Sequence, residues 1–90
     1  MTPSARAVRA FVVGALANPL RESGFDPGGV GEDFDLLTSG VVDSLGMIEL
    51  VVAVNERFGL DLDFEGLDPE QLTVLGPLSE YVARAAARVP

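Results

Sequence analysis

The stretch that decides the fold is Asp43-Ser44-Leu45-Gly46-Met47-Ile48-Glu49-Leu50-Val51-Val52-Ala53-Val54-Asn55-Glu56-Arg57-Phe58-Gly59-Leu60. At about 100° per residue, one helix face collects five apolar side chains: Met47, Leu50, Val51, Val54 and Phe58. The opposite face alternates aliphatic residues with carboxylates: Leu45, Glu49, Val52 and Glu56. Asp43 or Ser44 suits the start of such a helix and Gly59 suits its end. We therefore predict an amphipathic helix whose first face lies in the core.

The second face has two interpretations. Aliphatic side chains mixed with carboxylates suit a partner surface that is partly apolar and partly basic. Alternatively, Leu45 and Val52 are scattered surface aliphatics, which are common in soluble proteins. The pattern on this face leaves both interpretations open.

The region before this stretch predicts a helix and then a long loop. Apolar residues recur at helical spacing after Thr2-Pro3, so we expect a helix from Pro3 to Ala17 that Asn18-Pro19 ends or bends. Glycine and proline are frequent over residues 21–42, which predicts a loop. A loop of this length needs anchors in the core, and we expect them to be Phe25, Phe34, Leu36 and Leu37.

The region after it predicts a short helix and a final long one. Asp68 to Leu72 has a cap residue followed by proline, which is typical of a single helical turn. A last helix is expected to open at Thr73 or Ser79, to end near Arg88, and to bury Leu75, Leu78, Val82 and Ala85. Pro77 fits that helix only within its first turn. The sequence thus predicts one all-α domain over residues 1–90, with three main helices and one short helix.

Composition restricts the function. The 90 residues include 6 Arg, no Lys and 14 Asp plus Glu, giving a net charge of −8. This balance argues against nucleic-acid binding and favours basic protein partners. The chain has no Cys and no His, so it lacks a thiolate nucleophile, the usual general base and the commonest metal ligands. We expect no catalytic residue and therefore no enzyme.

Two further patterns in the sequence concern targeting and metal binding. The apolar run before Ala15-Leu16-Ala17 is too short for an export signal, and no run is long enough to span a membrane, so a cytoplasmic location is expected. We also expect a monomer. Asp61, Asp63, Glu65 and Gly66 match the first positions of a calcium loop, but Leu72 stands where a bidentate Glu is needed. We expect no metal site, and the acidic stretch from Asp61 to Asp68 has no assigned role.

Ser44 also has two interpretations. Because Asp and Ser are preferred N-caps, the simpler one is a plain helix start. However, a serine at this position is exposed and close to the positive end of the helix dipole, where a phosphate ester is favourably placed. The residues alone leave this choice open.

Residues 35–51, continuing from Asn55 through Leu60, resemble the phosphopantetheine-bearing region of acyl and peptidyl carrier proteins. The remainder is similar too: an amphipathic first helix, a long loop, a minor helix, and Leu72-Thr73-Val74 before a last helix. The resemblance covers essentially the whole chain. It implies a small four-helix carrier-protein bundle with a long loop between its first two helices.

The resemblance also implies a function. In that family a phosphopantetheinyl transferase attaches 4′-phosphopantetheine from coenzyme A to the serine hydroxyl, here Ser44, and thioester-bound cargo rides on the thiol of that arm. Further partners are an adenylate-forming ligase or acyltransferase and the downstream enzymes of the pathway. Residues at partner-contacting positions are Asp43, Leu45, Glu49, Val52 and Glu56. The absence of Cys fits a protein whose reactive sulfur belongs to its cofactor.

Two departures direct the interpretation away from classical fatty acid synthesis. The fatty-acid type usually has Gly three residues before the serine and often an acid two residues after it, where this chain has Val41 and Gly46. Its Gly-Val-Val-Asp-Ser segment is more similar to free-standing carriers loaded by an adenylate-forming ligase, which implies a specialised biosynthetic pathway. The alternative function is an unmodified acidic helical adaptor that binds a basic partner through the same helix.

Overall fold

The computed structural model describes residues 3–62 and 73–88. The described chain folds into α1 (Ala5–Ala15), α2 (Ala17–Glu22), a 3₁₀ helix η1 (Pro27–Gly29), α3 (Ser44–Phe58) and α5 (Leu75–Arg88). Over these residues the only extended pairing is an isolated antiparallel bridge between Asp35 and Val74. The expected small all-α fold is confirmed.

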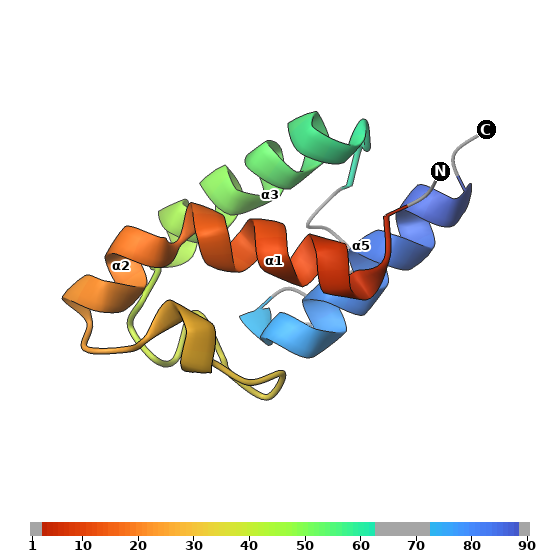
Figure 1. Ribbon diagram of the computed structural model, residues 1–90. Coiled ribbons are helices and arrows are strands. Elements are labelled where there is room, and N and C mark those ends of the chain that lie inside the picture. The colour runs from red at the N-terminus through yellow and green to blue at the C-terminus, as the bar shows by residue number, and fades with distance from the viewer. Residues whose placement is uncertain (1–2, 63–72, 89–90) are drawn as a thin grey trace.

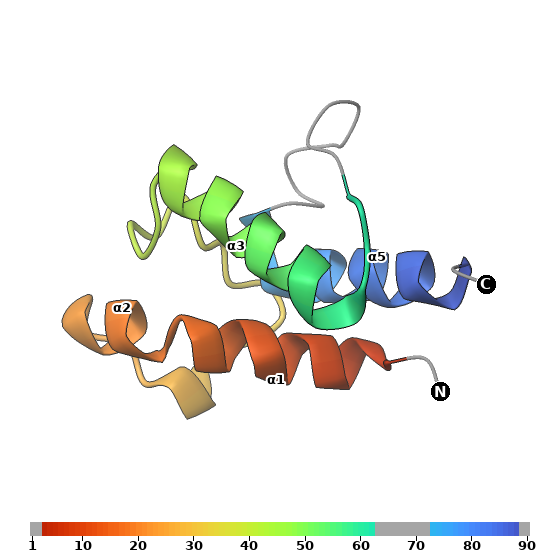
Figure 2. The ribbon, with the colours of Figure 1, turned by 90° about the horizontal axis from the view of Figure 1, so that it is seen from above.

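Three long helices build the core (Figure 1). α1 packs chiefly on α5, and the two run in opposite directions, so that the first turn of α1 and the last turn of α5 lie at the same end of the molecule. α3 lies above α1 in Figure 1 and crosses obliquely between α1 and α5 in Figure 2, and α2 lies at the same end of the molecule as the start of α3. The side chains that meet between the helices include Val8, Val12, Leu50, Val54, Leu75, Leu78 and Val82.

The first expected helix is two helices. α1 begins at Ala5, two residues later than expected, because the Ser4 side chain accepts a hydrogen bond from the Ala7 N–H at 3.1 Å; Thr2 lies outside the described residues. α2 then continues through Glu22, where a loop was expected. Pro19 is tolerated because it lies in the first turn of α2, where no N–H is needed.

The long loop is anchored differently from expectation. Leu36 is buried and Phe34 half-buried, as predicted, but Phe25 and Leu37 are each 37 % exposed. Phe25 instead packs edge to face on Phe34, with ring centroids 4.9 Å apart. The other buried residues of the loop are Val41 and Val42, just before α3. Their burial was missed because two adjacent valines carry no periodicity.

α3 agrees closely with its prediction. It runs from Ser44 to Phe58 and ends at Gly59, whose φ of 68° is the left-handed conformation that glycine adopts without strain. The predicted core residues are buried except for Phe58, which is half-buried and meets Phe11 of α1 edge to face at 5.6 Å. After the helix, the Asn55 side chain bonds both backbone groups of Leu62.

α5 begins at Leu75, between the two expected starts. Pro77 lies in its first turn, as required, and Ala86 rather than Ala85 completes the buried face. The buried Ser79 hydroxyl donates to the Leu75 carbonyl at 2.7 Å, so its burial leaves no polar atom unpaired. The short helix expected over 68–72 lies outside the described residues.

The loop packs closely against α5 at Gly76. Its N–H donates to the Glu32 carbonyl at 2.8 Å, and an added Cβ would lie 2.8 Å from the Glu32 Cβ and 3.0 Å from the Glu32 carbonyl oxygen. We expect Gly76→Ala to lower the free energy of unfolding by about 1–3 kcal/mol, measured by urea denaturation. Gly14→Ala in α1 is the matched control, because its Cβ would meet nothing within 4 Å and alanine is the better helix former by up to about 1 kcal/mol. Equal effects of the two substitutions would contradict this packing argument.

Candidate functional site

Ser44 is the first residue of α3, but it does not cap the helix. The Asp43 side chain caps it by accepting a hydrogen bond from the Gly46 N–H at 2.7 Å. Ser44 is exposed, and its hydroxyl forms no hydrogen bond with the described part of the chain. The plain-cap interpretation therefore fits Asp43 rather than Ser44, and the Ser44 hydroxyl is left without a structural task.

The segment before Ser44 holds it at a defined place. Val41 and Val42 are 8 % and 9 % exposed and belong to the core. The Val42 N–H donates to the Leu36 carbonyl at 3.1 Å, and the Ser39 hydroxyl donates to the same carbonyl at 3.2 Å. Two buried residues and a closed turn thus precede Asp43, so the start of α3 is fixed on one side by the core.

Asp35 ties this segment to Thr73, two residues before α5. One carboxylate oxygen accepts hydrogen bonds from the N–H groups of Leu37 and Thr38, at 2.9 and 3.0 Å, and the other accepts from the Thr73 hydroxyl at 3.3 Å. The backbone bond from Thr38 is the main cause that lowers the pKa of Asp35 below its usual value, while partial burial opposes it. Nothing in the residues around Asp35 predicts its bond to Thr73, 38 residues away.

The lowered pKa of Asp35 predicts a pH effect. A carboxyl whose folded pKa is depressed stabilises the fold above its unfolded pKa, about 3.9, and loses that contribution as pH falls through the folded value. We expect Asp35→Asn to be less stable than the wild type at pH 7 by on the order of 0.5–1 kcal/mol, since solvent screens the half-buried group. The deficit should shrink by pH 3 in urea titrations. Asp33→Asn controls for net charge, and a deficit independent of pH would contradict the role of the Asp35 charge.

The five residues expected to contact partners are all exposed, and four of them lie on α3, with Asp43 at its cap. Leu45 is 63 % exposed and Val52 is 50 % exposed. Ile48, 48 % exposed, was missed, although its spacing of three from Leu45 and four from Val52 places it beside both. We call this face the docking surface: Asp43, Leu45, Ile48, Glu49, Val52 and Glu56. A contiguous apolar strip rimmed by carboxylates favours the partner interpretation over scattered aliphatics.

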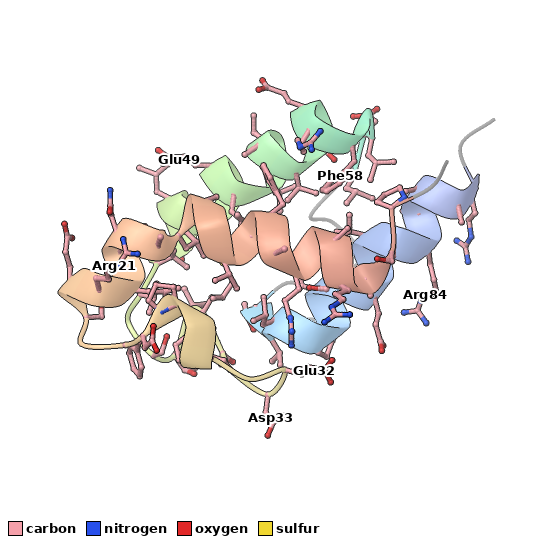
Figure 3. The ribbon with its side chains drawn as sticks, viewed as in Figure 1. Arg21, Glu32, Asp33, Glu49, Phe58 and Arg84 are labelled. Atoms are coloured by element: carbon pink, nitrogen blue, oxygen red, sulfur yellow. The ribbon has the colours of Figure 1, made fainter. Side chains whose placement is uncertain are left out.

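A groove borders the docking surface. It has a volume of about 370 Å³ and lies between the junction of α1 with α2 and the first three turns of α3. Leu16 and Pro19 line one side, and Gly46, Glu49 and Ala53 line the other. Figure 3 shows Glu49 projecting from α3 at the end of the molecule where α2 and Arg21 lie. Glu49 therefore belongs to both the groove and the docking surface.

Gly46 packs closely against the start of α3. A Cβ there would lie 3.1 Å from the Val42 Cβ and 3.3 Å from the capping oxygen of Asp43. Any side chain at this position would crowd the cap. The glycine therefore serves the local packing of the helix start.

The remaining expectations concern metals, membranes and relatives. Of the acidic stretch only Asp61 is described, and in the described ranges no three His, Cys, Asp or Glu side chains are grouped to hold a metal ion. None of the helices seen is both long and apolar enough to cross a membrane. Comparisons with protein-family models, with curated proteins and with solved structures found no match, so the chain's own residues carry the functional argument.

Proposed function

We propose that this chain is a free-standing carrier protein that bears 4′-phosphopantetheine on Ser44 and shuttles thioester-bound acyl or aminoacyl intermediates in a specialised biosynthetic pathway. The observation that carries the proposal is the exposed Ser44 hydroxyl, whose capping role is taken by Asp43 and which stands beside the docking surface. A hydroxyl with no structural task, next to an exposed apolar strip, suits covalent modification by a docked enzyme.

The residues present fit the proposed group. An arm held through one phosphodiester needs an accessible hydroxyl and open space around it, and Ser44 supplies both. In the loading reaction the Ser44 oxygen forms a bond to the pantetheine-side phosphorus of coenzyme A. The bond from that phosphorus to adenosine bisphosphate breaks, and the hydroxyl proton passes to a base of the transferase. When bound, the arm supplies the thiol on which cargo is held as a thioester.

Electrostatics at the start of α3 favour the modified form. α3 is a 15-residue helix, and its first turn carries backbone N–H groups that lack an intrahelical partner, together with the positive end of the helix dipole. A phosphodiester on Ser44 places its negative charge there, which contributes about 0.3–1 kcal/mol at an exposed helix start. α3 thus stabilises the modification in addition to presenting the hydroxyl.

The docking surface accounts for the partners in this proposal. Glu49 and Glu56 lie beside the apolar strip and attract basic enzyme surfaces, in line with a net charge of −8. The transferase, the loading ligase or acyltransferase and the downstream enzymes would each use this face in turn, so contacts are brief. Tethered cargo then reaches a docked active site at a high effective concentration.

Intact-mass measurement tests the proposal. The protein is incubated with coenzyme A, Mg²⁺ and a broad-specificity phosphopantetheinyl transferase, and we expect the mass to rise by one phosphopantetheinyl group. A known carrier protein treated in parallel shows that the transferase is active. If the control is modified and this chain keeps its original mass, the carrier proposal is wrong.

The second candidate is an unmodified adaptor that binds a basic partner. The docking surface favours it independently, because Leu45, Ile48 and Val52 are exposed whether or not Ser44 is modified. The same mass experiment separates the two candidates. A chain that gains no mass but still binds a partner through α3 would be an adaptor.

A further inference from the structure

Two arginines lie side by side on one face of α1. Arg6 and Arg9 are three residues apart and are therefore neighbours on the helix, and Ala10 and Val13 continue the same face toward its end. Arg6 is exposed and Arg9 is half-buried. Within the described part of the chain, neither guanidinium forms a salt bridge or a hydrogen bond. Both positive charges are therefore available to a ligand.

The place of Arg6 in its helix is electrostatically unfavourable. Arg6 is the second residue of α1, and the first turn of α1 contains no acidic residue. The positive end of the helix dipole lies in this turn and repels a cation. By contrast, three other arginines lie in the last turns of their helices, where the dipole favours them: Arg21, Arg57 and Arg88. An anion bound between Arg6 and Arg9 would offset this repulsion.

A groove of about 200 Å³ runs beside the two arginines, between α1 and the segment that contains η1. We call it the α1–η1 groove, and it is lined by Arg6, Arg9, Ala10, Val13, Pro27, Gly28 and Val30. Val13 and Val30 are half-buried and pack against the core. The lining includes no acidic residue, and the nearby Asp26 carboxylate accepts a hydrogen bond from the Gly28 N–H at 3.2 Å. The groove thus suits a ligand that is anionic at one end and aliphatic at the other.

Acidic residues near the arginines line a different groove. Glu32 of the loop and Glu80 of α5 line it, together with the other side of Arg6 and Arg9. These carboxylates repel an anion, so a ligand is expected on the η1 side. The carboxylates of the docking surface belong to α3, and α3 and η1 lie on opposite sides of α1 (Figures 1 and 2). Since charges beyond about 8 Å are largely screened at physiological ionic strength, the net charge of −8 permits an anion at this place.

The spacing of the groove residues along α1 fits an extended peptide. With a rise of about 1.5 Å per residue, Arg9 lies about 4.5 Å beyond Arg6 along the helix axis, and Val13 lies about 6 Å beyond Arg9. Side chains on one side of an extended chain are about 6.6 Å apart. Arginine side chains are long enough to adjust to this difference. Two alternate acidic residues, followed two positions later by an aliphatic one, would each meet a complementary residue, whereas a compact ion would occupy only the arginine end.

We propose that the α1–η1 groove binds an extended acidic peptide segment of a second protein. Two alternate carboxylates of the peptide pair with Arg6 and Arg9, and an aliphatic side chain lies against Val13 and Val30. Because α3 lies on the other side of α1, this peptide and a protein on the docking surface can be bound together. The inference goes beyond the proposed function and does not depend on modification of Ser44.

An NMR titration of the unmodified, isotope-labelled chain tests the proposal. The probe is the blocked pentapeptide acetyl-Glu-Ser-Glu-Ser-Val amide, and its matched control has Gln in place of both Glu residues. At low ionic strength we expect saturable amide shifts that are largest at groove residues, including Arg9, Ala10 and Gly28. The Gln peptide should bind about threefold more weakly or worse, since exposed ion pairs contribute modestly. Inorganic phosphate is titrated in parallel as a compact anion and should bind more weakly than the probe.

Matched arginine variants separate the groove from overall charge. Arg6→Gln and Arg9→Gln should each weaken binding of the probe by about twofold or more. Arg84→Gln removes an equal charge from an exposed site on α5 that lines neither groove, and it should leave binding within experimental error of the wild type. Arg6→Gln should unfold at the same or a higher urea concentration than the wild type, because it removes a cation from the positive end of α1. Weaker binding by this variant is then not a result of unfolding.

Several results would overturn the proposal. They are the absence of saturable shifts up to about 10 mM peptide, a concentration that detects even millimolar affinity, shifts centred away from the groove, equal binding of the Gln peptide or of phosphate, and an equal loss in Arg84→Gln. The protein used carries no phosphopantetheine. A negative mass experiment therefore leaves the peptide result standing, and a negative titration leaves the carrier proposal standing.

Discussion

A Ser44→Ala protein is expected to take up no phosphopantetheine and to unfold at the same urea concentration as the wild type. The loss is complete because the proposed attachment uses the Ser44 oxygen and nothing can replace it. Stability is retained because Asp43 caps α3 and the Ser44 hydroxyl bonds to no described residue. Exposed substitutions of this kind stay within about 0.5 kcal/mol of the wild type.

The control is Ser23→Ala, which removes another exposed hydroxyl, at the end of α2. It should gain the same mass as the wild type under the same conditions. Intact mass and urea denaturation are measured on all three proteins. If Ser44→Ala still gains the group, the attachment lies elsewhere. If Ser44→Ala lowers the free energy of unfolding by more than about 1 kcal/mol, the change exceeds that of ordinary surface substitutions and the hydroxyl has a structural role.

Truncation to alanine is expected to have different effects at Leu75, in the core, and at Leu45, on the docking surface. Leu75 is fully buried at the start of α5, among the core residues that join α1, α3 and the loop. We expect Leu75→Ala to lower the free energy of unfolding by about 2–5 kcal/mol, through lost burial and the cavity left behind. Since a small domain has only about 5–15 kcal/mol in total, much of the protein would unfold at moderate temperature.

Leu45→Ala is the matched substitution at the docking surface. Leu45 is 63 % exposed, so its truncation should change stability by no more than about 0.5 kcal/mol. It should instead raise the KM of the transferase for this protein, because the apolar strip is shortened where the enzyme contacts Ser44. Urea denaturation and transferase kinetics measure the two effects. A large stability loss in Leu45→Ala would mean that this leucine belongs to the core and that the docking surface is wrongly placed.

Sequence reasoning succeeded where the determining interactions are local. The bounds of α3 follow from a cap at Asp43, a glycine at Gly59 and apolar spacing between them, all within a few residues of one another. Proline in the first turn of α5 was predicted on the same basis. Sequence reasoning failed where neighbouring residues are compatible with two structures. Asn18-Pro19 can be followed by either a loop or a new helix, and the burial of Leu20 in the core favours the helix α2.

The same distinction between local and long-range interactions applies to the candidate site. The exposed serine and the face that carries Leu45, Glu49 and Val52 follow from helical periodicity, which places residues three and four apart side by side. Ile48 follows from the same rule and could have been found with it. The exposure of Leu37 could not have been found, because in a loop the sequence sets no direction for a side chain.

By itself, the sequence determined an all-α chain, the two faces of α3 and a serine at its start, because helix formation depends on neighbours along the chain. Only the tertiary structure decided how the loop is held and what lies beside α3. Asp35 bonds to Thr73, 38 residues away, and loop carbonyls at Glu32 and Phe34 pair with the first N–H groups of α5. The groove forms where α1 and α2 meet α3. These features depend on segments that come together only when the apolar faces are buried. Patterns among neighbouring residues therefore do not predict them.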